Sequence, residues 1–141
     1  MPFTIDPTTD FGARVTTHLA DDQVVWLTTV REDGRPEPSP VWFLWDGETV
    51  IIYSQANTPK LRNIAANPNV SLNFNSTSHG GDVVIISGAA EIATDAPPAH
   101  AIPAYVAKYA GGFESLKMTP EAFADGYPVA IRVTPTKLRG H

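Results

Sequence analysis

The residues with the clearest capacity for chemistry lie in the segment YSQANTPKLRN, residues 53–63. The hydroxyl residue Thr58 followed by Pro59 is typical of the start of a helix. The first N–H groups of a helix have no partner within it and lie at the positive end of the helix dipole, so they attract anions. Lys60 adds a full positive charge there. We therefore expect either an anion site, such as one for a phosphate, or simply a well-formed helix start.

The sequence around Lys60 favours the anion site. Residues 49–81 contain no Asp or Glu, although the whole chain has 15 acidic residues, whereas Lys60, Arg62 and His79 lie within this stretch. A pocket that holds an anion must not repel it, so the lack of carboxylates agrees with such a site. The apolar strands of the segment also explain this lack, and both explanations stay open at this point.

Other kinds of catalytic site find little support in the sequence. It has no G-x-S-x-G motif, no glycine-rich nucleotide-binding loop and no two histidines spaced as metal ligands. The absence of cysteine excludes disulfides, thiolate nucleophiles and cysteine-bound metal centres. We predict no metal site, and we expect each of the four histidines at the surface or in a loop: His18, His79, His100 and His141.

The composition is that of an ordinary globular protein. The chain has 141 residues, of which 43% are hydrophobic and 18% charged, and we expect one domain over residues 1–141. The net charge of −5 argues against a general nucleic-acid binder, and no apolar run is long enough to span a membrane. The N-terminal segment lacks the pattern of an export signal, so we expect a cytoplasmic protein.

Six segments with the composition of strands are separated by turn residues or short helices. Asp33-Gly34 and Asp46-Gly47 predict tight turns after the first and second strands, and Gly88 predicts a bulge or a close backbone approach within the fifth. The expected strands are residues 23–30, 38–45, 48–54, 70–76, 82–93 and 129–133. Strands in such close succession favour an antiparallel barrel, in a chain that is mainly β with short helices, of the α+β class.

Short helices are expected between these strands. One covers residues 10–20 with Asp10 as its N-cap, and another begins at Thr58 and stops at Asn67-Pro68. A third runs to Tyr109 and is ended by Gly111-Gly112, because glycine is common just after a helix. A fourth, short helix begins at Thr119-Pro120, and a basic tail follows the last strand.

Several short motifs, taken in order, resemble the flavin-binding split-barrel family. This family is typified by pyridoxamine 5′-phosphate oxidase and by actinobacterial reductases that use the deazaflavin F420. The motifs are Gly34-Arg35-Pro36, Tyr53-Ser54-Gln55, Thr58-Pro59-Lys60, Lys60-Leu61-Arg62-Asn63 and Asn67-Pro68. The resemblance covers about residues 20–93. The strand near the C-terminus also resembles the closing strand of the family. The resemblance implies a six-stranded antiparallel split β-barrel like that of FMN-binding proteins.

The resemblance also implies which residues bind the cofactor. Lys60 would hold its phosphate together with the hydroxyls of Ser54 and Thr58, and Gln55 would lie nearby. Arg62 would replace an arginine that the oxidases carry where this chain has Pro59. The strand residues Ser39, Pro40, Val41 and Trp42 would line the redox ring, with Thr28 and Thr29 beneath it. No catalytic side chain is identified.

The function implied by the resemblance is that of an F420H2-dependent oxidoreductase, which transfers a hydride from the deazaflavin to a small organic substrate. The alternatives are an FMN-binding oxidoreductase or flavin carrier, and a small-ligand-binding barrel without a redox role. Oxidation of pyridoxamine phosphate is not expected, because the ring-lining strand lacks the arginine of the oxidases. The family further implies a homodimer with the cofactor between its subunits, and the Ala- and Pro-rich composition suits an actinobacterial source.

Overall fold

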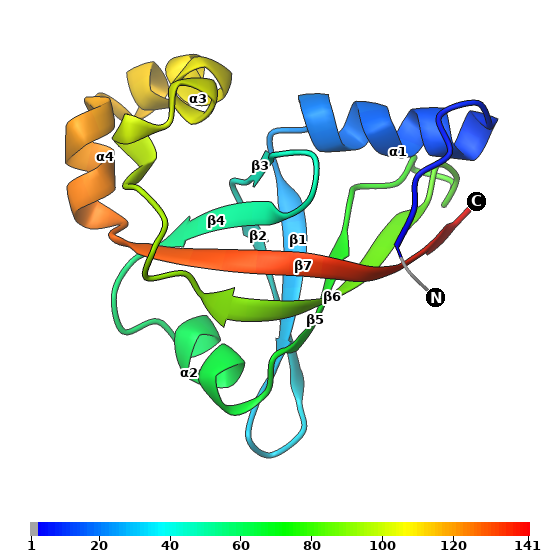
Figure 1. Cartoon of the computed structure of the whole chain (residues 1–141), viewed down its shortest axis with the longest axis horizontal. Coiled ribbons are helices and arrows are strands. Elements are labelled where there is room, and N and C mark those ends of the chain that lie inside the picture. The colour runs from blue at the N-terminus through cyan, green and yellow to red at the C-terminus, as the bar shows by residue number, and fades with distance from the viewer. Residues whose placement is uncertain (1–2) are drawn as a thin grey trace.

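A curved antiparallel sheet of seven strands lies at the centre of the molecule (Figure 1). The computed structural model describes residues 3–141. The strands are β1 (Val25–Val30), β2 (Pro36–Val41), β3 (Leu44–Trp45), β4 (Val50–Ser54), β5 (Asn69–Asn73), β6 (Val84–Ile92) and β7 (Val129–Gly140). Their order across the sheet is β2-β1-β5-β6-β7-β4-β3, and each neighbouring pair is antiparallel. The sheet forms a half-barrel with β2 and β3 at its edges.

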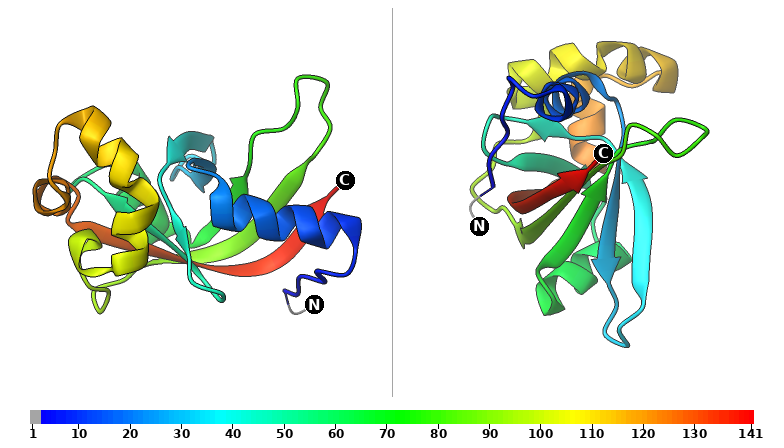
Figure 2. Two further views of the ribbon diagram at one scale, coloured as in Figure 1. Left: turned by 90° about the horizontal axis from the view of Figure 1, so that it is seen from above. Right: turned by 90° about the vertical axis from the view of Figure 1, so that its right-hand side faces the viewer.

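The helices lie around this sheet (Figure 2). They are α1 (Asp10–Asp21), α2 (Pro59–Ala66), the 3-10 helix η1 (Ala99–Ala101), α3 (Pro103–Leu116) and α4 (Pro120–Gly126). Helix α1 lies at one end of the sheet, and α3 and α4 lie together at the other (Figure 1). The N-cap of α1 is Thr9 rather than the predicted Asp10, because the Thr9 hydroxyl accepts a hydrogen bond from the Gly12 N–H at 2.9 Å. Within residues 3–141, no helix is both long and apolar enough to cross a membrane.

The prediction of six strands was wrong because residues 38–45 do not form one strand. The chain leaves the sheet at Trp42 and Phe43, between β2 and β3. The Phe43 N–H donates a hydrogen bond to the Tyr109 hydroxyl at 2.8 Å, and the Phe43 carbonyl accepts one from Lys108 Nζ at 2.9 Å. Both partners belong to α3. The backbone that would have continued the strand therefore binds a helix from a distant part of the chain.

The third helix was predicted to run to Tyr109, where the backbone is indeed non-helical (φ −106°, ψ 15°) and α3 is kinked. The helix then continues through Gly111 and Gly112, which were expected to end it, and stops at Leu116, where Lys117 adopts the left-handed conformation with φ 55°. The reason for a glycine at 112 is packing, since a Cβ atom there would lie 2.7 Å from Cη2 of Trp42. This glycine lets the helix approach the indole ring closely.

Strands β6 and β7 form the longest ladder of the sheet. The predicted irregularity at Gly88 is confirmed, because the register shifts between Ser87 and Gly88. A Cβ atom at Gly88 would lie 2.9 Å from the Thr134 carbonyl oxygen, so the backbones approach closely. The expected basic tail is instead a continuation of β7, which pairs with β6 as far as Gly140 opposite Val84.

The buried side chains form two clusters on opposite sides of β4. The barrel core lies between the half-barrel and α1 and includes Val15, Leu19, Leu27, Phe43 and Ile52. The aromatic cluster lies beneath α3 and α4 and includes Tyr53, Tyr105, Tyr109, Phe113 and Phe123. All five residues of β4 are buried. One face of the strand contacts the barrel core, and the opposite face contacts the aromatic cluster. The strand thereby connects the half-barrel to the helical part of the molecule.

An ionic network fastens α1 to the loop before β6. The His18 ring contacts Asp22 through Nδ1 at 2.6 Å and Asp82 through Nε2 at 2.9 Å, while Arg14 Nη1 pairs with Asp82 at 2.7 Å. Burial alone lowers the pKa of His18, but the hydrogen bonds that its ring donates to the carboxylates of Asp22 and Asp82 outweigh this effect and raise the pKa above its ordinary value. The expectation of a surface or loop position was therefore wrong for His18, whose side chain lies in a helix and is only 13% exposed.

Candidate functional site

A cleft of about 400 Å³ opens where α2, the end of β2, the end of β4 and the α3–α4 region meet. We call it the α2 cleft. Seven of the nine predicted cofactor residues line it, namely Pro40, Val41, Trp42, Ser54, Gln55, Thr58 and Lys60. The fold thus brings together residues that are up to 20 positions apart in the sequence.

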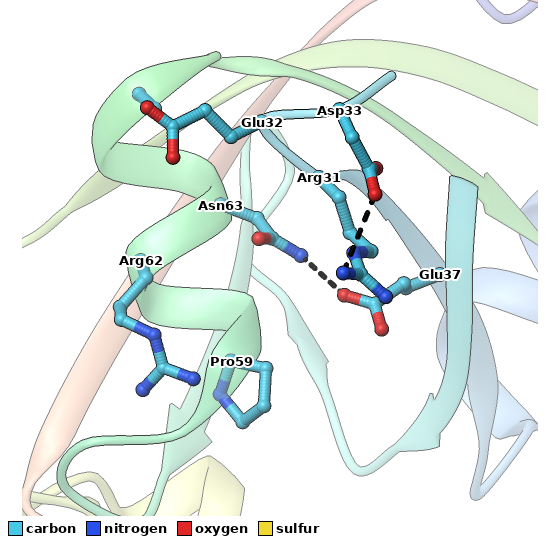
Figure 3. Close-up of a pocket in the computed structure, with 8 residues that line it drawn as sticks. Arg31, Glu32, Asp33, Glu37, Pro59, Arg62 and Asn63 are labelled. Carbon is cyan, nitrogen blue, oxygen red and sulfur yellow. Dashed lines mark hydrogen bonds and ion pairs between the residues drawn. The ribbon is translucent and has the colours of Figure 1, made fainter. Parts of the chain in front are cut away.

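The other two predicted residues lie beside this cleft. Ser39 lines a smaller hollow of about 270 Å³, which shares Thr58 and Lys60 with the α2 cleft. Arg62 lines a third groove, of about 740 Å³, between α2 and the β1–β2 hairpin (Figure 3). Its Nη1 atom donates a hydrogen bond to the Asn57 carbonyl oxygen at 3.1 Å. The structure therefore does not bring Arg62 to the α2 cleft.

Lys60 is half-buried in the first turn of α2 and faces two of these hollows. Burial lowers the pKa of its ammonium group below the usual range. Among residues 3–141 no carboxylate forms an ion pair with it. A partly desolvated cation without a counter-charge is costly, and a bound anion would remove that cost.

The start of α2 leaves the Lys60 N–H available. Pro59 has no N–H group, and the Leu61 N–H already donates to the Thr58 carbonyl at 3.1 Å. Thr58 occupies the N-cap position, but its side chain makes no capping hydrogen bond. Its hydroxyl instead lies 2.9 Å from the buried hydroxyl of Ser54, and Ser54 Oγ donates to the Gln55 carbonyl at 2.8 Å. Two hydroxyl groups and an ammonium group therefore converge at a helix N-terminus, which is the chemistry expected of a phosphate site.

Asn63 ties α2 to the sheet one turn after Lys60. This buried side chain donates from Nδ2 to Thr29 Oγ1 at 3.0 Å. It also donates to Glu37 Oε1 at 2.9 Å (Figure 3). Thr29 belongs to β1 and Glu37 to β2, so the amide fixes the distance between α2 and two strands. The sequence analysis included Asn63 only as part of a motif and missed this contact. No local sequence signal identifies it, because both partners are far away in the chain.

Strand β2 offers acceptors along its outer edge. It pairs only with β1, and it contains Pro36, Pro38 and Pro40. Proline is accepted in an edge strand where its missing N–H would have faced outward. The outer edge therefore presents carbonyl oxygens and lacks N–H donors at these positions, which makes it a poor edge for adding another strand and a suitable one for a ligand with N–H groups.

Aromatic side chains form the far end of the α2 cleft. Trp42 stacks on Tyr109 with ring centroids 4.4 Å apart and on Phe123 at 5.3 Å, and Phe123 stacks on Tyr127 at 4.5 Å. Sequence analysis placed Trp42 at the site but missed the other lining residues Tyr53, Leu116, Phe123 and Tyr127. They come from β4 and the α3–α4 region, whose position against β2 has no signal in the sequence.

Comparisons with known proteins agree with this architecture. The family model described as pyridoxamine 5′-phosphate oxidase matches residues 11–141. No curated protein matches the chain significantly.

Among solved structures, an F420 reductase is 27% identical with a TM-score of 0.62, and the match covers 87% of this chain and 94% of that one. A protein of Listeria innocua described as a putative pyridoxamine 5′-phosphate oxidase is 24% identical, with a TM-score of 0.65 and coverages of 90% and 94%. A conserved hypothetical protein of Mycobacterium tuberculosis is 18% identical, with a TM-score of 0.72 and coverages of 99% and 88%.

Proposed function

Because the chain belongs to the pyridoxamine 5′-phosphate oxidase family, we propose that the α2 cleft binds the phosphate and ring of a flavin-type cofactor. We further propose that this cofactor is F420 and that the protein is an F420H2-dependent reductase of a small organic substrate. The similarity to an F420 reductase supports this choice over other flavins. FMN is the alternative, because its phosphate needs the same groups.

The observation that carries the proposal is the unpaired, half-buried Lys60 at the mouth of a cleft that no Asp or Glu lines. A cofactor phosphate would accept hydrogen bonds from its ammonium group and, once the hydroxyls of Ser54 and Thr58 turn away from their present acceptors, from these two groups as well. We infer that Gln55 lies beside this phosphate and that Arg62, in the neighbouring groove, contributes charge at longer range. These donors fit the group, so the cleft is chemically suited to it.

The ring of the cofactor would lie along β2, from Ser39 to Trp42. The pyrimidine edge of a flavin or deazaflavin carries an N–H group, and the outer edge of β2 presents carbonyl oxygens that can accept from it. Trp42 is held by its stacking on Tyr109, so it gives the ring a fixed apolar wall. The site therefore orients the ring before any substrate arrives.

When bound, the reduced cofactor supplies the hydride, and the substrate also takes up a proton from water. The task of this chain is to bind and to orient. Tyr53 is not free to act as an acid, because its hydroxyl donates to the Pro97 carbonyl at 2.6 Å and burial raises its pKa. We therefore expect no single side chain to be indispensable for the chemistry.

We also propose a homodimer in which the partner subunit completes the α2 cleft. The cleft is open to solvent in the single chain, and an open site admits water that a hydride-transfer site must exclude. The prolines of β2 make strand addition at that edge unfavourable, so the subunits would pack through side chains.

Separate fluorescence titrations of the purified apoprotein with F420 and with FMN test the proposed function. Tight binding of F420 alone supports the reductase. Binding of FMN alone would redirect the assignment to the FMN-dependent alternative, and binding of neither would reject a redox cofactor at this site. Sedimentation of the loaded protein tests the dimer, which a monomer at micromolar concentration would contradict.

A further inference from the structure

We propose that the aromatic end of the α2 cleft, formed by Leu116, Phe123 and Tyr127 with Trp42 at its border with the cofactor ring, binds the substrate. We further propose that this substrate is an uncharged and largely apolar molecule. This inference rests on the proposed function, because it assigns the opposite end of the cleft to the phosphate of the cofactor.

The two ends of the cleft differ in polarity. Ser54, Gln55, Thr58 and Lys60 carry the hydrogen-bonding groups and come from the end of β4 and the start of α2. The aromatic end comes from the end of β2, α3, α4 and the residue after α4. The whole cleft is filled best by a polar group at one end and an apolar group at the other. Two ligands side by side meet this requirement, with the cofactor phosphate at the polar end and the substrate at the aromatic end.

The rings of the aromatic end stack on one another. The Trp42 and Phe123 rings are inclined by 21°, and the Phe123 and Tyr127 rings by 14°. Because mutual stacking uses the faces of these rings, a ligand at this end meets a rigid apolar wall. These rings also belong to or pack against the aromatic cluster, so they do not need to be ordered when a ligand binds.

Leu116 is an exposed apolar side chain at the rim of this end. It is 52% exposed, and among the described residues the other large apolar side chain reported as exposed is Ile92, at 37%. The backbone around Leu116 is fixed, since the Lys117 N–H donates to the Glu114 carbonyl at 3.0 Å and the Met118 N–H to the Phe113 carbonyl at 3.0 Å. A ligand that covers Leu116 removes this apolar surface from water.

Charge is nearly absent from the lining. Lys60 is the charged residue of the α2 cleft, and a bound phosphate would neutralise it. The Tyr53 hydroxyl is already used by Pro97. A charged substrate at the aromatic end would lose its hydration without gaining a partner, which is costly, whereas an uncharged one would not.

The cofactor ring itself fits the aromatic end less well. The polar edge of a flavin or deazaflavin needs hydrogen-bond partners, and the side chains of the aromatic end carry few polar groups, namely the Tyr127 hydroxyl and the indole N–H of Trp42. The carbonyl oxygens along β2 meet this need better. The ring and the substrate would then lie next to one another, as hydride transfer requires.

Calorimetric binding of two probes tests this inference on the cofactor-loaded protein at neutral pH. The probes are 2-naphthol, which is uncharged, and 2-naphthoate, which has the same rings with a carboxylate. We expect 2-naphthol to bind at least about tenfold more tightly. Leu116→Asp should weaken 2-naphthol binding by about tenfold, the scale of a lost apolar contact, and leave the cofactor dissociation constant within about twofold. Ile92→Asp is the matched control and should change neither.

Two outcomes would overturn the inference. Equal binding of both probes would show that the aromatic end does not select against charge. A Leu116→Asp variant that loses cofactor affinity as strongly as 2-naphthol affinity would show that the ring occupies this end. If the wild-type protein binds neither F420 nor FMN, the proposed function fails separately, and titration of 2-naphthol into the apoprotein still reports on the aromatic end.

Discussion

Helices α2 and α4 both begin with the dipeptide Thr-Pro, but the threonine makes different hydrogen bonds in each. At the start of α4, the Thr119 hydroxyl accepts a hydrogen bond from the Ala122 N–H at 3.0 Å, and Glu121 lies in the first turn. At the start of α2, the Thr58 hydroxyl makes no capping bond and contacts Ser54 instead, and Lys60 takes the place of the acidic residue. A side chain therefore caps the N-terminus of α4, whereas no side chain caps the N-terminus of α2.

The difference shows how a helix start can be kept available for a ligand. An acidic residue near a helix N-terminus is stabilising and a basic one is not, so α2 lacks two local contributions that α4 has. Contacts with the sheet replace them, since Asn63 of α2 binds Thr29 and Glu37. A Thr-Pro pair in the sequence is therefore ambiguous, and the neighbouring charge together with the distant partner decides its role.

Of the variants that test the difference between α2 and α4, Lys60→Ala is expected to have the largest effect, a loss of cofactor affinity. Removal of the ammonium group should weaken cofactor binding by roughly 1.5 to 3 kcal/mol, the usual scale for a charged hydrogen bond. The dissociation constant from fluorescence titration measures this loss. Lys137→Ala, at an exposed position of β7, is the matched control and should bind normally. Unchanged affinity in Lys60→Ala would reject the phosphate site.

The next effect in size concerns the bond that replaces local capping in α2. Asn63→Ala removes two hydrogen bonds and leaves the buried Thr29 hydroxyl without this donor. We expect the free energy of unfolding to fall by roughly 2 kcal/mol, together with weaker cofactor binding. Urea denaturation and the cofactor titration measure these two effects. A variant of full stability would show that α2 is held in place by other contacts.

A smaller effect distinguishes the two threonines directly. Thr119→Ala should reduce the free energy of unfolding by about 1 kcal/mol, because it removes a capping hydrogen bond, and should leave cofactor binding unchanged. Thr58→Ala should show the reverse pattern, with little loss of capping stability and weaker cofactor binding. Thermal unfolding and cofactor titration of both variants test the crossed pattern. Identical behaviour of the two variants would contradict the comparison.

The smallest effect is a dependence on pH. Burial lowers the pKa of Lys60 from 10.5, so between the lowered value and 10.5 the folded apoprotein binds fewer protons than the unfolded chain does. In that window this group makes the free energy of unfolding rise with pH, while affinity for the phosphate falls because the cation is lost.

Cofactor titrations from about pH 7 upward measure this fall in affinity. Lys108 also titrates in this range, with its pKa lowered by burial to about 8, but it does not line the cleft. Lys60→Arg keeps both Lys108 and a permanent charge at 60, so its affinity should stay constant over the same range. An equal decline in both proteins would assign the effect to another group.

Local patterns predicted the parts of the fold that depend on local physics. The turns at Asp33-Gly34 and Asp46-Gly47 join the expected neighbouring segments, the helix after Thr58 is present, and Gly88 lies at the irregularity between β6 and β7. Seven of the nine expected cofactor residues lie around one cleft. Each of these predictions rested on residues close together in the chain or on the order of family motifs.

The features that sequence analysis missed depend on partners far away in the chain. The break at Phe43 arises from hydrogen bonds with Tyr109 and Lys108, more than 60 positions later. His18 is bound by Asp82, and Asn63 by Thr29 and Glu37. None of these pairs has a periodic or short-range signal, so only the three-dimensional structure identifies them.

Because Gly112 contacts Trp42, a residue that does not line the cleft can influence which ligands the cleft accepts. Gly112 lies against the six-membered ring of the indole, and Trp42 also lines the cleft. Any larger residue at 112 would force the indole to shift, and this would reshape the wall. We therefore expect these two positions to covary during evolution, so that a bulkier residue at position 112 accompanies a residue smaller than tryptophan at position 42.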